Sequence, residues 1–127
     1  LILNNLAYLL AEDPARRESA YEYIDRAIRV AGSNERLREQ LEDTKATILI
    51  HDGKFQDAID LLQAWVGKAR GVEVYLHLAV AYDRLGSPEV AAKFLAPVTE
   101  RIEQGTAQLS GHDLEVYHSL RQRVTAS

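Results

Sequence analysis

The stretch His51-Asp52-Gly53-Lys54 brings an imidazole, a carboxylate and an amine together in four residues. In an active site, such a carboxylate would orient the histidine, and the histidine would activate a nucleophile. Adjacent side chains near a helix end, however, point in different directions. A histidine at a helix C-terminus also interacts favourably with the helix dipole, and Asp-Gly-Lys is typical of a turn. We therefore interpret the stretch as a turn between two helices.

Other histidines also invite a chemical interpretation. His112, Glu115 and His118 are spaced by three and share a helix face loosely, which is one way to chelate a metal. Further ligands would be needed and none is indicated, so we interpret these residues as a solvated helix face. His77, inside the apolar run YLHLAV, is interpreted as a packed or groove-lining residue. The sequence also lacks a glycine-rich phosphate loop and the common hydrolase motifs. No catalytic, cofactor-binding or metal-binding residue is predicted, and we do not expect an enzyme.

The elements that carry these residues are predicted to be helices throughout. Apolar residues recur at spacings of three and four along most of the chain, and no long stretch alternates with period two. The predicted class is all-α. Helices are expected near residues 2–12, 14–31, 35–52, 55–69, 72–85, 88–104 and 112–125.

The breaks between these helices have physical causes. Asp13 can cap a helix whose first turn holds Pro14, where the missing N–H costs nothing. Gly32 can close one helix and Asn34 can cap the next. Pro97 falls inside the expected helix 88–104 and should kink it or split it.

Composition limits the classes of partner. The 127 residues include 15 basic and 19 acidic side chains, a net charge of −4, which argues against binding nucleic acid through bulk electrostatics. The opening apolar run is about ten residues long and is interrupted by Asn4 and Asn5, whereas a spanning helix needs about twenty apolar residues. We therefore expect no nucleic acid partner and no direct membrane insertion. There is no cysteine, so the redox compartment cannot be inferred.

An internal repeat organises most of the chain. An alanine is followed seven residues later by a glycine, twelve later by a second alanine, and four beyond that by a leucine; this unit occurs twice at an offset of 33 residues. Small residues on paired helices let the two axes approach closely, and the larger residue fills the seam. The matching residues are Ala46, Gly53, Ala58 and Leu62, then Ala79, Gly86, Ala91 and Leu95, with a looser copy at Ala7, Pro14, Ala20 and Ile24.

With this repeat the chain resembles the tetratricopeptide repeat (TPR) family, whose units are helix–turn–helix motifs of about 34 residues. The segments KATILIHDGKFQDAIDLL and YLHLAVAYDRLGSPEVAAKFL carry the resemblance most closely, and LNNLAYLL with SAYEYIDRAI carries it less tightly. The resemblance implies one TPR domain over residues 1–127, built as a right-handed α-solenoid. Its repeats would lie at about 1–33, 35–70 and 72–104, followed by a capping helix at 112–125. The opening LNNLAYLLAE looks like the long bacterial TPR proteins, so we expect a piece of a larger protein, with cytoplasm and periplasm both open.

Some residues depart from the family pattern. Trp65 stands where the family usually has a small residue, so the second repeat should pack differently at that seam. The first two units are 39 residues apart, which suggests extra turns at the start of the third helix. The tail fits no repeat and is expected to direct Leu114, Tyr117, Leu120 and Val124 toward the last repeat, with Arg121 and Arg123 in water.

The function implied by the resemblance is protein–protein interaction. In this family the first helices of successive repeats line a concave groove that binds an extended peptide or a partner helix. Helical spacing assigns to the groove Asn4, Asn5, Tyr8 and Glu12, then Asp43, Thr47, Ile50 and His51, and finally Glu73, Leu76, Val80, Asp83 and Arg84. Acids outnumber arginine in this set, so a neutral or slightly basic protein or peptide is the expected partner.

The alternative is a structural spacer or a self-association module, for which the apolar start at Leu1, Ile2 and Leu3 is the argument.

Overall fold

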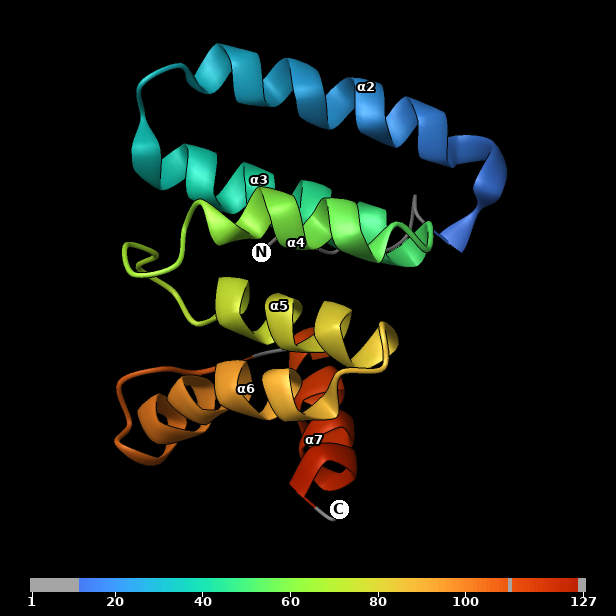
Figure 1. The fold of residues 1–127 in the computed structure, drawn as a ribbon. Helices are drawn as coiled ribbons and strands as arrows, with labels where there is room; N and C mark the ends of the chain where they lie inside the picture. Colours follow the sequence, from blue (N-terminus) through green and yellow to red (C-terminus); the bar gives the residue numbers. More distant parts are fainter. Residues whose placement is uncertain (1–11, 110, 126–127) are drawn as a thin grey trace. The chain divides into compact units, whose positions relative to one another are not determined.

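The computed structural model describes residues 12–109 and 111–125, and over these ranges the chain is all-α, with six helices and no strand (Figure 1). The expected helix at 2–12 lies almost wholly outside the described residues. The chain divides into two compact units, Leu1–Trp65 and Val66–Ser127. The helices are α2 (Pro14–Ala31), α3 (Glu35–His51), α4 (Phe55–Gln63), α5 (Glu73–Arg84), α6 (Pro88–Glu103) and α7 (Gly111–Thr125).

Local capping explains why the starts of α2 and α3 agree with the prediction. The Asp13 carboxylate accepts a hydrogen bond of 3.0 Å from the N–H of Ala15, and Pro14 occupies the first position of α2. Asn34 accepts a bond of 3.2 Å from the N–H of Leu37 at the start of α3. These bonds satisfy backbone donors that a helix start leaves without partners, so both starts are set by residues next to them in the sequence.

One expectation about helix continuity is wrong, and one of the two outcomes expected at Pro97 is excluded. α4 was expected to run to residue 69 but ends at Gln63, and turns occupy residues 64–68. There Trp65 is buried, and its indole N–H donates a hydrogen bond of 3.1 Å to the carboxylate of Glu42 in α3. Pro97 does not split its helix, because α6 is continuous from Pro88 to Glu103.

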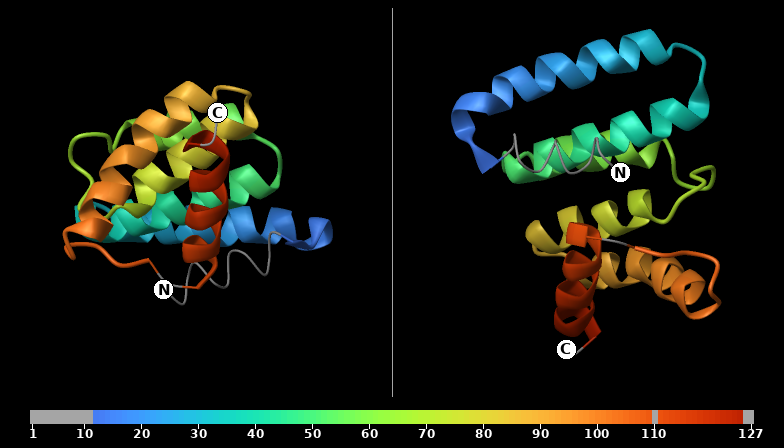
Figure 2. Two further views of the ribbon diagram at one scale, coloured as in Figure 1. Left: turned by 90° about the horizontal axis from the view of Figure 1, so that it is seen from below. Right: turned by 180° about the vertical axis from the view of Figure 1, so that it is seen from behind.

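The first unit packs α2, α3 and α4 through small and branched side chains. Ala20 and Ile24 of α2 form one core cluster with Leu41 and Ile48 of α3. In Figures 1 and 2, α2 lies alongside α3 as an antiparallel hairpin, and α3 and α4 form a second one. Antiparallel neighbours joined by short turns are the simplest way to bury such apolar stripes.

The second unit is built on the antiparallel hairpin of α5 and α6. Ala79 and Ala91 are fully buried where the two helices meet, and Leu95 fills the space beside them. Tyr82 stacks on Phe94, with ring centroids 5.5 Å apart and planes 8° from parallel. The small residues allow a close approach, and the larger ones seal it.

Helix α7 completes the core of the second unit. Tyr117, Leu120 and Val124 are buried in the same cluster as the apolar residues of α5 and α6. The Tyr117 hydroxyl lies 2.9 Å from the hydroxyl of Thr99 in α6 and donates to it. α7 crosses α6 instead of lying alongside it, as all the views in Figures 1 and 2 show.

Candidate functional site

The stretch His51-Asp52-Gly53-Lys54 forms the turn between α3 and α4, as the sequence predicts. α3 ends at His51, Gly53 has a positive φ of 77°, and α4 begins at Phe55. The left-handed backbone at Gly53 is readily adopted only by glycine, which explains the residue type at this point.

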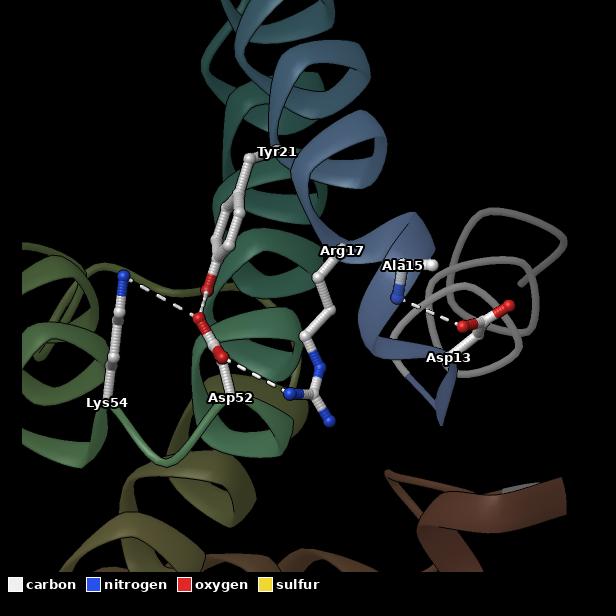
Figure 3. A network of polar contacts seen from close by, with 6 residues as sticks. All are labelled: Asp13, Ala15, Arg17, Tyr21, Asp52 and Lys54. Atoms are coloured by element: carbon white, nitrogen blue, oxygen red, sulfur yellow. Dashed lines mark hydrogen bonds and ion pairs between the residues drawn. The ribbon is translucent and has the colours of Figure 1, made fainter.

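Asp52 is the centre of a polar network that joins α2 to this turn (Figure 3). Its carboxylate accepts a hydrogen bond of 2.9 Å from the Tyr21 hydroxyl and lies 3.3 Å from the guanidinium of Arg17. The Lys54 ammonium is 3.6 Å from the same carboxylate and 5.6 Å from the centre of the Tyr21 ring. Both cationic groups of the network are therefore directed at the Asp52 carboxylate, and the network fastens α2 to the α3–α4 turn.

The ionisation of the two central groups follows from these contacts. The hydrogen bond from Tyr21 and the charges of Lys54 and Arg17 lower the pKa of the Asp52 carboxyl, against the opposing effect of burial. Burial, followed by the hydrogen bond to Asp52, raises the pKa of the Tyr21 phenol. Asp52 is thus ionised and Tyr21 protonated at neutral pH, which is the pairing that holds the turn.

The predicted groove residues of the first unit differ in accessibility. Asp43 and Thr47 are buried, with 4% and 3% of their surfaces exposed, and the Thr47 hydroxyl donates to the backbone carbonyl of Asp43 at 3.1 Å. Ile50 and His51 are half-buried. Glu12 is exposed, whereas Asn4, Asn5 and Tyr8 lie outside the described residues.

The predicted groove residues of the second unit are divided between core and surface. Leu76 is fully buried and belongs to the core cluster that contains Tyr117 and Leu120 of α7, so it serves packing. The others are reachable to different degrees: Glu73, Val80 and Asp83 are half-buried and Arg84 is exposed.

Two polar pairs join α7 to α5, and neither was found from the sequence. The Nε2 of buried His77 lies 3.0 Å from the carboxylate of buried Asp113, and the Arg123 guanidinium lies 3.0 Å from the carboxylate of Asp83. His77 is thus a packed histidine, one of the two roles expected of it. The residues of each pair are at least 36 residues apart in the chain, so only the fold brings them together.

The buried stripe of α7 begins one residue earlier than expected. Asp113 is buried, whereas Leu114, expected on this stripe, is 39% exposed. Asp113, Tyr117, Leu120 and Val124 are spaced by four, three and four, which keeps them on one helical face. This spacing is the signal that could have identified Asp113, since an acidic residue in phase with an apolar stripe needs a buried partner.

An open groove of about 350 Å³ lies between α6 and α7. Its apolar floor and charged rim are formed by Ala92, Leu95, Ala96, Thr99, Glu100, Glu103, Arg121 and Val124. Across the rim, the Arg121 guanidinium is 3.7 Å from the Glu103 carboxylate, and both side chains are largely exposed. The groove shows that α7 does not close fully against α6 at its C-terminal end.

Within residues 12–109 and 111–125, no group of three or more His, Asp or Glu side chains is placed to hold a metal ion. No helix in these ranges combines the length and the apolar character needed to cross a membrane. Comparison with family models, curated proteins and solved structures gave no match. The resemblance to TPR proteins therefore rests on the residue pattern alone.

Proposed function

We propose that the chain is a TPR-like protein-interaction module that binds a peptide or a partner helix on the first helices of its hairpins and carries out no catalysis. In this proposal the hairpins belong to a right-handed solenoid of about three units with α7 as its terminal helix. The groove residues with at least part of their surface exposed are Glu12, Ile50, His51, Glu73, Val80, Asp83 and Arg84, of which Val80 and Asp83 contact the α7 side of the second unit.

The observation that carries the proposal is that two hairpins, one in each unit, have buried alanines at the same spacing along their seams. Ala46 and Ala58 are fully buried in α3 and α4, as are Ala79 and Ala91 in α5 and α6. Each pair is separated by twelve residues, and the two pairs are 33 residues apart. Repetition of one hairpin at a fixed offset is the construction principle of solenoids that act as interaction scaffolds.

The chemistry of the accessible groove residues suits a peptide ligand. They combine aliphatic, imidazole, carboxylate and guanidinium groups, which are the mixed anchors that peptide recognition uses. In this proposal the polar network at Asp52 is structural and not catalytic, because Tyr21, Arg17 and Lys54 all contact the Asp52 carboxylate.

The test is affinity capture from a lysate of the source organism with three forms of the chain. These are the wild type, a groove variant (His51→Ala, Glu73→Ala, Arg84→Ala) and a control variant on the second helices (Gln56→Ala, Asp60→Ala, Lys93→Ala). Both variants leave the formal net charge unchanged, and all three control residues are exposed. A protein retained by the wild type and the control but lost from the groove variant supports the proposal. Identical partner sets for all three forms contradict it.

Self-association is a second candidate, because α2 has exposed apolar side chains. Tyr23 is 52% exposed and Val30 is 82% exposed, and a spacing of seven residues puts them on one face. If this face mediates association, light scattering should give a mass above 14.2 kDa that returns to the monomer value in Tyr23→Ser, Val30→Ser. A monomer mass for the wild type at high concentration contradicts this candidate.

A further inference from the structure

We propose that the face of α5 and α6 beneath α7 is a binding surface for an amphipathic helix, with α7 as its resident and displaceable occupant. The inference rests on the proposed function, since it treats the first-helix face of this hairpin as the ligand-binding face. It adds the kind of ligand, a helix, and the competitor that this ligand must displace.

The first argument is that α7 contacts residues that helical spacing assigns to the groove. Asp83 of that set pairs with Arg123 at 3.0 Å. Leu76 lies in the same core cluster as Tyr117 and Leu120 of α7, and Val80 packs against this cluster. α7 therefore already occupies part of the surface to which a partner would bind.

The second argument is that α7 is attached in the manner of a docked helix. One stripe of Tyr117, Leu120 and Val124 is buried, and the side chains of Glu115 and His118 are exposed. Because α7 crosses α6, it contacts the hairpin over a shorter length than α5 and α6 contact each other (Figures 1 and 2). Helix-in-groove recognition uses the same arrangement of apolar anchors at i, i+3 and i+7.

The third argument is incomplete closure. The open groove of about 350 Å³ beside Arg121 and Val124 leaves apolar atoms of α6 without contacts from α7. Atoms that line a gap lose their dispersion contacts, so α7 is held less strongly along this groove. The α5–α6 seam, by contrast, is closed by the fully buried Ala79 and Ala91. α7 should therefore be released before the hairpin unfolds.

These contacts define the chemistry of a competing helix. It would present apolar residues with the spacing of Tyr117, Leu120 and Val124. It would carry an acidic residue one turn before this stripe to reach His77, and a basic residue near the end of the stripe to reach Asp83.

The experiment uses the full chain and thiol labelling, which is simple here because the natural sequence has no cysteine. Leu120→Cys places the only thiol in the buried stripe of α7, and the matched control Ala91→Cys places it in α6, at the buried seam with α5. If α7 is released on its own, Cys at position 120 should react about tenfold or more faster than Cys at position 91. Equal rates would mean that both become accessible only when the whole unit unfolds, and would overturn the proposal.

A peptide with the sequence Gly111–Thr125 then serves as the competing helix. If it binds the vacated face, the labelling rate at position 120 should rise with peptide concentration, doubling when the concentration equals the Kd of the peptide for that face. Labelling at position 91 should not rise. A control peptide with Ser in place of Tyr117, Leu120 and Val124 should have no effect. A rate that is independent of the first peptide up to millimolar concentration overturns the proposal.

Hydrogen exchange of the wild type covers the case in which a cysteine variant fails to fold. Amides of α7 should exchange faster than those of α5 and α6, and Arg123→Gln should speed α7 exchange about two- to fivefold, the range expected for a solvent-exposed ion pair. Arg36→Gln, an exposed arginine of α3, is the control and should have no effect on α7. A common exchange rate for α5, α6 and α7 overturns the proposal. None of these measurements needs a cellular partner, so their outcome is distinguishable from that of the affinity capture.

Discussion

At the scale of single residues, the polar side chains that could take part in chemistry connect helices to one another. Asp52 connects α2 to the α3–α4 turn, and His77 holds α7 through Asp113. Glu42 accepts hydrogen bonds from both Trp65 and Arg38, at 3.1 and 3.0 Å. A buried carboxylate with two donors is stabilised, whereas one left without partners would cost several kcal/mol.

Asp52→Asn should remove a pH-dependent part of the stability. Because the folded pKa of Asp52 is lowered, its ionised form stabilises the fold above the unfolded value of about 3.9, and this contribution is lost as the pH falls through the folded pKa. Near pH 7 the wild type should be more stable than Asp52→Asn by about 1 kcal/mol, the difference between hydrogen bonds to charged and neutral acceptors. Urea unfolding at pH 7, 5 and 3 measures this. A gap that stays constant down to pH 3 would contradict the expectation.

Ala79→Leu should destabilise the second unit by about 1–3 kcal/mol, because the added side chain overpacks the seam between α5 and α6. Ala46→Leu should act similarly between α3 and α4. Ala15→Leu, at an exposed position of α2, should change the free energy of unfolding little. Denaturant melts of the three variants test the helix register, which is wrong if either seam variant is as stable as the control.

At the scale of helices, what could be predicted depended on how local the cause is. The starts of α2 and α3 follow from Asp13, Pro14 and Asn34, which act within three residues of themselves. The early end of α4 coincides with the burial of Trp65 against Glu42, 23 residues away, and no local pattern reveals such a contact. The candidate site shows the same limit. Helical spacing assigned Leu76 to the groove, but Leu76 is buried in a core cluster that includes residues of α7.

Pro97→Ala should stabilise the second unit. Pro97 lies inside the continuous helix α6, where it lacks a backbone donor and crowds the preceding turn, at a cost of up to about 3 kcal/mol. Part of the gain is offset, because alanine leaves the unfolded chain freer, so we expect about 1–2 kcal/mol. Pro88→Ala, in the first turn of the same helix, is the matched control and should not stabilise, since proline suits that position. Thermal or urea unfolding compares the two, and equal effects would contradict this account.

At the scale of the whole molecule, the chain is two compact units that meet in sequence at Trp65 and Val66. In the stretch between α4 and α5, four residues are exposed: Val66, Gly67, Lys68 and Arg70. In this stretch the Gly67 N–H donates to the Tyr75 hydroxyl at 3.0 Å, and Arg101 donates to the carbonyl of Arg70 at 3.2 Å. Lys68 and Arg70 therefore lie exposed outside the helices, where a protease can reach the backbone.

Limited trypsin digestion should cut first after Lys68 or Arg70, because proteases act on exposed turns before intact helices. Time-resolved mass spectrometry should show two early fragments, ending at residue 68 or 70 and beginning at 69 or 71. In the double variant Lys68→Gln, Arg70→Gln these fragments should disappear. Early cleavage within α3 or α6 would contradict the assignment of this boundary.

The hydrogen bond between Trp65 and Glu42 has a spectroscopic consequence. Trp65 is the chain's one tryptophan, and its indole is buried in the unit Leu1–Trp65. Its fluorescence should shift to longer wavelength when that unit opens, whereas far-ultraviolet circular dichroism follows the helices of both units. The natural chain thus carries an intrinsic optical probe of one of its two units. Coincident melting curves from the two signals indicate one cooperative transition, and separate curves indicate that the units unfold independently.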